Sequence, residues 1–222
     1  PEEPKMIISR DESLKRLRER IEQKVPIVGG GAGTGISAKF EEAGGIDLII
    51  IYNSGRYRMM GHGSIAGMMG YGDANGVAME IGEYEVLPVV KEIPVICGVH
   101  CTDPRRRMWH WLQQVKAMGF SGMNNFPTHS IIDGDFRQQL EETGMGTNKE
   151  VETVALARKM DIFTIVYVAS PQEAKDMAEA GADVIIAHVG CTVGGSIGVT
   201  DAAMSLDDAA TATQAIIDAG KS

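Results

Sequence analysis

The stretch Asp47-Leu48-Ile49-Ile50-Ile51-Tyr52 and its counterpart Asp183-Val184-Ile185-Ile186-Ala187-His188 decide the fold class of this chain. Both runs are rich in β-branched and other apolar residues and show no polar alternation, which is typical of a strand buried on both faces. Strands of that kind belong to parallel sheets whose two faces are covered by helices. The sequence therefore predicts an α/β protein.

Four further apolar runs extend this pattern along the chain. Strands are expected to start near residues 26, 47, 94, 121, 163 and 183. Their mean spacing of about 31 residues is the size of one βα unit. Gly45, Gly119 and Gly181 each follow a helix-like stretch, so we expect them to end those helices in the left-handed conformation.

The repeat favours a TIM barrel over an open doubly wound sheet, because a glycine or polar residue follows every strand. A (β/α)8 barrel has eight units, and this chain holds about six. We expect a linker or artificial boundary at residues 1–9 and a TIM-barrel domain over residues 10–222 that stops about two units before closure. Two sheet edges would then be exposed, so a longer natural protein or another chain is expected to cover them.

Composition limits the class of protein and its partners. The 222 residues are 44% hydrophobic and 23% charged, as in ordinary globular proteins. The formal charge of -9 disfavours nucleic acid as a partner. The apolar runs fall far short of the roughly 20 residues that span a bilayer, so no membrane partner is expected. Three cysteines cannot all pair, which indicates a reducing, cytoplasmic setting.

Two glycine-rich loops can bring backbone donors close to an anion. The first joins the first strand to a helix and offers Gly31, Gly33 and Thr34; a tight turn without a ligand is the alternative. The second loop follows the sixth strand and offers a further anion cradle, whose residues are Gly194, Gly195 and Ser196.

A nucleotide cofactor is not expected. The first loop lacks the lysine of a P-loop, because Ile36 and Ser37 follow its last glycine. The second strand ends at Asn53, where a dinucleotide site needs an acidic residue for the ribose.

Polar residues after the second strand form a candidate anion clamp. Asn53, Ser54 and Arg56 lie in a segment that also carries two phenols, and such groups can bind a carboxylate or phosphate. A solvated or subunit-contacting loop is the alternative.

Three further residues are candidates for chemistry. His188 ends the sixth strand, where an imidazole can act as acid or base, unless it is a satisfied core histidine. Asn125 ends the fourth strand and can read a carbonyl or hydroxyl group. Glu142 can bind a cation or move a proton, or lie on a solvated helix face.

Cysteine and histidine residues at the ends of the third and sixth strands have a spacing close to that of metal ligands. They are Cys97, His100 and Cys101 at the third strand and His188 and Cys191 at the sixth. Alternate residues on a strand point to opposite faces, so buried thiols are favoured over a zinc site.

Several longer motifs resemble the phosphoenolpyruvate hydrolase-like TIM-barrel family. The similarity runs from about Arg10 onward and includes Gly30-Gly31-Ala32-Gly33-Thr34-Gly35, Ile51-Tyr52-Asn53-Ser54-Gly55-Arg56-Tyr57-Arg58-Met59, Asn125-Phe126-Pro127-Thr128, Leu140-Glu141-Glu142-Thr143-Gly144-Met145-Gly146 and Gly194-Gly195-Ser196-Ile197-Gly198. The resemblance implies a (β/α)8 barrel related to the phosphoenolpyruvate mutase and indole-glycerol-phosphate synthase groups. It also implies attachment to other modules, such as transcriptional activators or the amino-terminal half of two-domain plant virus-resistance proteins.

The resemblance implies a small phosphorylated or carboxylated ligand of the phosphoenolpyruvate or phosphonopyruvate class, bound and hydrolysed or otherwise transformed. Arg56 is then expected to hold the anion, Glu142 a divalent cation or proton, and His188 the transferred proton. Mg2+ is the cation expected for such substrates. Two alternatives stay open: a non-catalytic metabolite sensor and an oligomerisation domain of a larger protein. A homo-oligomer or an attached amino-terminal domain is expected.

Overall fold

The computed structural model describes residues 8–221, so most of the predicted linker at 1–9 lies outside the described residues. At the centre of the fold is one parallel sheet whose strands follow one another in chain order. Ile49 pairs with Val95 and Ile165 with Val184 in its register. The strands are β1 (Gly29–Gly31), β2 (Leu48–Ile51), β3 (Val95–Gly98), β4 (Gly122–Asn124), β5 (Phe163–Val168) and β6 (Val184–Ala187).

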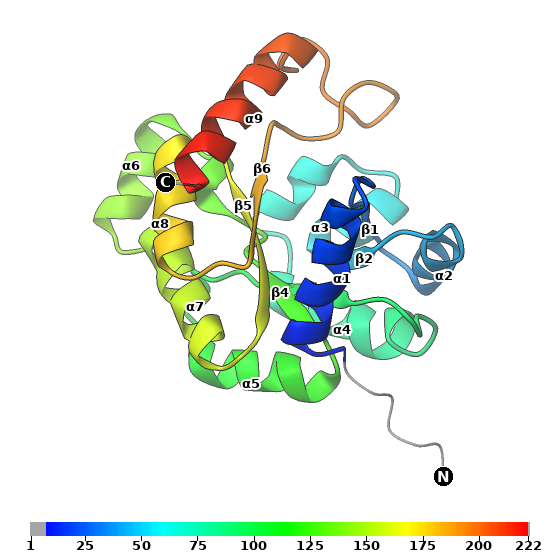
Figure 1. The fold of residues 1–222 in the computed structure, drawn as a ribbon. Coiled ribbons are helices and arrows are strands. Elements are labelled where there is room, and N and C mark those ends of the chain that lie inside the picture. Colours follow the sequence, from blue (N-terminus) through cyan, green and yellow to red (C-terminus); the bar gives the residue numbers. More distant parts are fainter. Residues whose placement is uncertain (1–7, 222) are drawn as a thin grey trace.

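Helices connect the strands and surround the sheet (Figure 1). The α-helices are α1 (Arg10–Glu22), α2 (Gly35–Ala43), α3 (Asn53–Met59), α4 (Ala74–Ile81), α5 (Met108–Met118), α6 (Gly134–Glu142), α7 (Asn148–Lys159), α8 (Pro171–Glu179) and α9 (Leu206–Gly220). Three short helical segments of other types complete the set: η1 (Ser64–Met68), η2 (Gly82–Val86) and η3 (His129–Ile131).

The α/β class and the six predicted parallel strands are confirmed. The left-handed helix ends are confirmed as well, with φ angles of 87° at Gly45, 107° at Gly119 and 87° at Gly181. Sequential parallel order is the order of a TIM barrel, but β1 and β6 stand at opposite ends of the sheet. The two further units that would close a (β/α)8 barrel stay a prediction.

The first strand begins at Gly29, later than the start near residue 26 that the apolar pattern predicts. Pro26 has no N–H to donate. The N–H of Val28 donates to the Asp47 carboxylate at 2.8 Å, so a side chain binds the donor that a neighbouring strand would otherwise bind. The apolar run before β1 is consequently partly exposed, with Ile27 and Val28 on the surface.

The convex face of the sheet is buried under helices. Outward-pointing residues of β2 and β3 pack in one cluster with helix residues such as Ile81 of α4 and Leu112 of α5. Val166 and Val168 of β5 pack in another with α7, α8 and α9. The outer sides of β2, β3 and β5 are therefore covered, as their uninterrupted apolar runs require.

The first helix, α1, covers the concave face at the amino ends of the strands. Leu17 is buried there and packs in one cluster with Leu48 and Ile50 of β2, Ile96 of β3 and Phe163 and Ile165 of β5. Arg10 binds Asp183 at 2.5 Å, and Arg20 binds Asp47 at 2.5 Å. These ion pairs fix α1 to the residues just before β6 and β2. Figure 1 shows α1 lying between β6 and β1.

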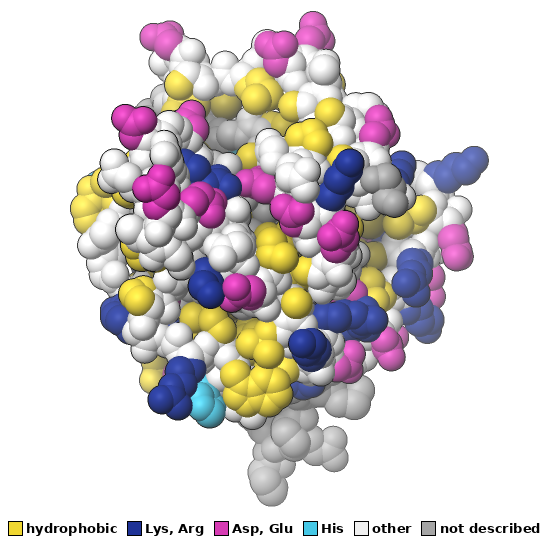
Figure 2. All heavy atoms as spheres, turned by 90° about the vertical axis from the view of Figure 1, so that its left-hand side faces the viewer, with side chains coloured by type: hydrophobic (Ala, Val, Ile, Leu, Met, Phe, Trp, Pro, Cys, Tyr) yellow, Lys and Arg dark blue, Asp and Glu magenta, His cyan; other side chains and the backbone are white. Residues whose placement is uncertain are grey.

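Charge is distributed rather than concentrated on the face formed by α6, α7 and α8. Figure 2 shows acidic and basic side chains interspersed there, with hydrophobic side chains gathered toward the lower edge. None of the helices within residues 8–221 combines the length and apolarity needed to cross a bilayer.

Replacing Leu17 with alanine is expected to lower the free energy of unfolding by about 3 kcal/mol, because a cavity would remain between α1 and the sheet. Urea unfolding followed by circular dichroism measures this change. Leu206→Ala is the matched control, since Leu206 is 88% exposed at the start of α9 and should change stability little. Equal effects of both substitutions would show that α1 does not stabilise the concave face.

Candidate functional site

A cavity of about 360 Å3 opens on the concave face at the carboxyl ends of the strands. Barrel enzymes keep their sites at this end because loops from every strand converge there. The cavity lies beyond the strand residues that pack on α1. It is lined by Gly31, Tyr52, Ser54, Arg58, Ser64, Phe126, Tyr167, Ile186, Ala187, His188, Val189, Gly190, Cys191 and Thr192.

Aromatic rings form one wall of this cavity. The ring of Phe126 lies 4.7 Å from that of Tyr52 and 6.2 Å from that of Tyr167, between ring centroids. Tyr167 in turn lies 5.2 Å from the ring of His188. Burial raises the pKa of Tyr167, so its hydroxyl stays protonated near neutral pH.

His188 is a neutral imidazole at neutral pH, because burial lowers its pKa. The N–H of Gly190 donates to Nδ1 of His188 at 3.4 Å. A neutral ring in a cavity wall is able to take up or deliver a proton.

The positive charge of the cavity comes from Arg58 on α3. Its guanidinium donates to the carbonyl oxygen of Gly31 at 3.2 Å and to Oγ of Ser64 at 3.4 Å. It also lies over the ring of Tyr52, at 5.6 Å from the centroid. Among the described residues no carboxylate oxygen lies within 4 Å of it, so the charge is available to a ligand.

Gly31 makes room for this arrangement. A Cβ at this position would lie 3.0 Å from Nη2 of Arg58 and 3.2 Å from the hydroxyl oxygen of Tyr52. Both contacts are tighter than ordinary van der Waals contact, so a larger residue would shift the guanidinium of Arg58 or the ring of Tyr52 by a few tenths of an ångström. The glycine thereby sets the position of the cationic group.

Hydroxyl groups line the side of the cavity formed by η1 and the loop after β6. Oγ of Ser64 and Oγ1 of Thr192 lie 3.0 Å apart and share a hydrogen bond. Ser54 donates to the carbonyl oxygen of Ser64 at 2.8 Å. Because each hydroxyl has one hydrogen, the Ser64–Thr192 pair keeps one hydrogen to donate to an anionic ligand, whereas the hydrogen of Ser54 is already donated.

The structure brings three of the sequence-predicted residues to this cavity: Gly31, Ser54 and His188. Asn53 and Asn125 are buried and bind the protein itself. Asn53 donates to the carbonyl oxygen of Gly67 at 2.8 Å, and Asn125 donates to the Glu150 carboxylate at 2.6 Å. Their side chains position the loops around the cavity.

The predicted glycine-loop residues hold local structure. A Cβ at Gly33 would lie 2.1 Å from the carbonyl oxygen of Gly55, so this glycine permits close packing on α3. Thr34 caps α2 in a reciprocal arrangement with Ser37. Gly194, Gly195 and Ser196 form a turn outside the cavity, with the N–H of Gly198 donating to Gly194 at 3.0 Å.

Arg56 and Glu142 lie outside the cavity. Arg56 faces the helix layer and pairs with Glu85 at 2.7 Å and with Glu80 at 3.3 Å. Glu142 is exposed on α6 and accepts a hydrogen bond from Gln138 at 2.7 Å. Neither side chain is placed to contact a ligand that occupies the cavity.

Glu150 is a functional candidate that the sequence pattern does not reveal. Its fully buried carboxylate accepts from Nδ2 of Asn125 at 2.6 Å, from Oγ1 of Thr128 at 2.7 Å and from the N–H of His129 at 2.7 Å. Burial raises its pKa to about 7. These bonds fix the segment that carries Phe126 of the aromatic wall.

A smaller cavity of about 240 Å3 lies beside the first and contains His100, Asp103 and His129. The two imidazole rings are 5.9 Å apart. His129 is already bound, through Nδ1 to the carbonyl oxygen of Met145 and through Nε2 to Thr102 at 3.3 Å. Burial lowers the pKa of His100 to about 4, so both rings are neutral at neutral pH.

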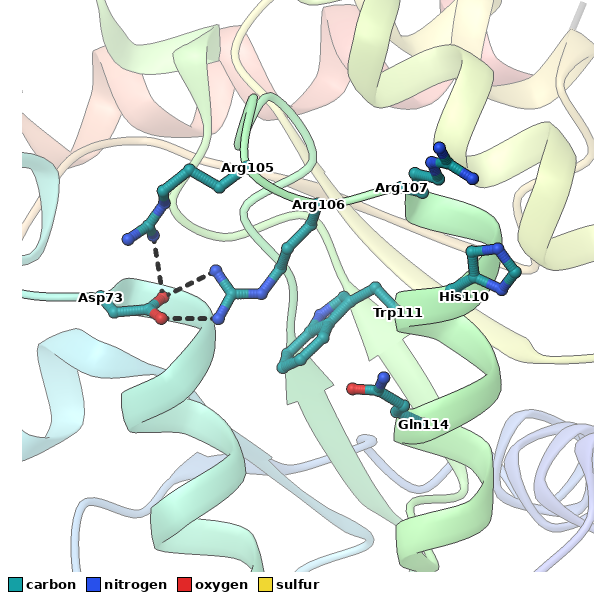
Figure 3. Close-up of a pocket in the computed structure, with 7 residues that line it drawn as sticks. All are labelled: Asp73, Arg105, Arg106, Arg107, His110, Trp111 and Gln114. Carbon is teal, nitrogen blue, oxygen red and sulfur yellow. Dashed lines mark hydrogen bonds and ion pairs between the residues drawn. The ribbon is translucent and has the colours of Figure 1, made fainter.

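An external cavity of about 460 Å3 lies between the start of α4 and α5 (Figure 3). Two of its three guanidinium groups are neutralised, because Asp73 binds Arg106 at 2.5 Å and Arg105 at 3.1 Å. The third, that of Arg107, points away from Asp73 (Figure 3). Arg106 also stacks over Trp111 at 4.4 Å from the ring centroid. We therefore place the candidate site at the strand ends, where Arg58 is unpaired.

The described residues contain no group of three or more His, Cys, Asp or Glu side chains placed to hold a metal ion. Cys97 and Cys101 are buried, and burial raises the pKa of both thiols. These thiols are thus protonated rather than metal-binding thiolates at neutral pH.

Comparison with known proteins identifies the family of this chain and several solved structures that share its fold. A family model described as phosphoenolpyruvate hydrolase-like matches residues 12–222. The Solanum lycopersicum ToMV resistance protein Tm-1(GCR237) and ToMV susceptible protein tm-1(GCR26) are each 54% identical over 216 residues. That alignment covers 97% of this chain but only 28% of the length of each relative.

Solved structures of acid-metabolising enzymes share the fold at low identity. Phosphonopyruvate hydrolase in complex with oxalate and Mg2+ superposes with a TM-score of 0.55 and 16% identity, over 79% of this chain and 62% of that chain. Oxaloacetate acetylhydrolase in complex with 3,3-difluorooxalacetate gives a TM-score of 0.58 and 14% identity, over 93% and 69%. 2,3-Dimethylmalate lyase, described as a phosphoenolpyruvate mutase/isocitrate lyase superfamily member, shares the fold with a TM-score of 0.53 and 16% identity, over 90% of this chain and 78% of that chain.

Glu150→Gln is expected to flatten the pH dependence of stability. The folded protein binds the Glu150 proton more tightly than the unfolded chain, so this residue's contribution to the unfolding free energy falls as pH rises from 4.5 to about 7. The fall amounts to about 3 kcal/mol. Urea unfolding of the variant and of wild type across this pH range measures the difference between their unfolding free energies.

Glu142→Gln removes an exposed carboxyl group and is the matched control for this measurement. Its effect on the unfolding free energy should be small throughout this range, because the side chain is exposed. A constant difference for Glu150→Gln would show that Glu150 does not titrate in this window.

Proposed function

Because the chain belongs to the phosphoenolpyruvate hydrolase-like family, we propose that its strand-end cavity binds and transforms a small phosphorylated or carboxylated acid of the phosphoenolpyruvate or phosphonopyruvate class. The observation that carries this proposal is the unpaired guanidinium of Arg58 inside the cavity. A guanidinium binds a carboxylate or phosphate through two parallel N–H donors. The hydroxyl pair of Ser64 and Thr192 supplies one further donor on the adjoining side.

The proposed chemistry is proton transfer at the bound acid. His188 is neutral and sits in the wall, so it can accept or return a proton at the ligand. Tyr167 packs against it and holds the orientation of the ring. Arg58 would stabilise negative charge that develops on the ligand oxygens.

Binding without turnover is a second candidate function. The observation that favours it is that no carboxylate lines the cavity. Besides Arg58, its titratable side chains are His188, Cys191 and two tyrosines. A site with one imidazole and no second side chain to act as its acid or base partner suits recognition as well as catalysis. The protein would then report the presence of the acid to other parts of a larger assembly.

Arg58→Met is expected to remove the thermal stabilisation that a bound acid produces. Wild-type protein should be stabilised by at least one of phosphoenolpyruvate, phosphonopyruvate, pyruvate or oxalate in a thermal-shift screen, since a ligand of the folded state raises its stability. Arg56→Met is the matched control, because Arg56 lies two residues away and binds Glu80 and Glu85. Loss of the shift in both variants, or no shift in wild type, would contradict the proposal.

His188→Gln separates the two candidate functions. If the cavity is catalytic, turnover of the acid that stabilises the protein should fall by about 100-fold or more, because a general acid or base is lost. Ligand-induced stabilisation should persist, since Arg58 remains. Coupled assays of pyruvate and phosphate release measure the turnover. Unchanged turnover would remove His188 from the mechanism, and absence of turnover in wild type would favour the sensor.

A further inference from the structure

The donor groups of the strand-end cavity are unlike those of a magnesium site. Mg2+ requires octahedral oxygen ligands and is usually held through carboxylates, together with water and substrate oxygens. The side chains that line this cavity offer a guanidinium, an imidazole, a thiol and neutral hydroxyls, and they include no aspartate or glutamate. The set therefore does not fit the cation that the family resemblance leads one to expect.

Two buried carboxylates lie behind the strand ends, and both are bound elsewhere. The oxygens of Glu150 accept three hydrogen bonds of 2.6 to 2.7 Å from residues 125–129. Asp103 binds Arg105 and Arg106 and also accepts from Asn75 at 3.2 Å. Releasing either group to a metal would leave buried donors without partners.

Glu41 on α2 is a half-buried carboxylate near β1; burial raises its pKa, and the positive charge of Arg58 opposes that shift. The Oε2 atom of Glu41 has no hydrogen-bond partner, and a Cβ at Gly30 would lie 2.6 Å from it. Gly30 precedes Gly31, and successive residues of a strand point to opposite faces. Glu41 therefore lies on the helix side of β1, whereas Gly31 faces the cavity.

Arg58 carries the positive charge that a metal ion would otherwise bring. Its guanidinium is held by Gly31, Ser64 and the ring of Tyr52, and no carboxylate oxygen of the described residues lies within 4 Å of it. A fixed cation disfavours a second cation at short range and favours a negative ligand. Its planar donors match the two oxygens of a carboxylate.

We propose that this cavity binds a small carboxylate without a divalent cation, with Arg58 as the group that neutralises the ligand. The inference rests on the proposed function, because it concerns the ligand of the same cavity. It defines the ligand class more narrowly, as an acid that binds free of metal. The ligand enters as the bare anion, and its carboxylate oxygens accept hydrogen bonds from the guanidinium and the neighbouring hydroxyl pair.

Isothermal titration of oxalate into the full chain tests this inference, first with excess EDTA and then with excess MgCl2. The Kd expressed for free oxalate, after correction for the magnesium–oxalate complex, is expected to be the same in both buffers. Arg58→Met should weaken binding by about 10- to 100-fold in EDTA, as expected for loss of hydrogen bonds to a charged group. Arg58→Lys keeps the charge but not the planar fork, so it should show a smaller loss. Arg56→Met should bind like wild type, and circular dichroism confirms that each variant is folded.

The outcomes separate this inference from the proposed function. Oxalate binding that appears only with MgCl2, or that tightens tenfold or more with it, would overturn metal-free binding and leave the acid-binding proposal standing. Absence of oxalate binding in both buffers would overturn the inference, and absence of any stabilising acid in the thermal screen would remove the proposed function too. Equal binding in both buffers together with loss in Arg58→Met supports the inference.

Discussion

Burial of both faces of a parallel sheet is the constraint on which the rest of this structure depends. The convex face is covered by helices that the βα repeat supplies. The concave face needs a different solution, and α1 provides it only at the amino ends of the strands, through Leu17 and the ion pairs of Arg10 and Arg20. The carboxyl-end half of that face is left for Tyr52, Phe126, Tyr167 and the cavity they enclose.

Sequence patterns predict those features of the fold that depend on local rules. Apolar runs and left-handed glycines depend on neighbouring residues, so five strand starts lie within about one residue of expectation and the three glycine ends are confirmed. The first strand departs because Asp47, distant in sequence, binds the N–H of Val28. Long-range side-chain bonds of this kind leave no periodic signal.

The candidate site shows the same division between local and long-range information. Arg56 and Arg58 lie in one short helix, and a separation of two residues places them about 200° apart around its axis. Which of the two faces the cavity depends on how α3 packs, and the packing directs Arg56 to Glu80 and Glu85. Glu150 is likewise held in the interior by hydrogen bonds from residues 125–129, which are distant from it in sequence. Its neighbours in the sequence are those of a helix, as they are for the exposed Glu142, so the sequence alone does not distinguish the two.

The hydroxyl pair of Ser64 and Thr192 joins segments 128 residues apart across one side of the cavity. Both groups are uncharged, so dissolved ions screen their attraction very little, whereas the attraction of an anion to the guanidinium of Arg58 weakens as ionic strength rises. The shape of this side of the cavity and the affinity for an anion thus respond differently to ionic strength. At high salt the hydroxyl pair would keep its geometry while the occupancy of the cavity falls.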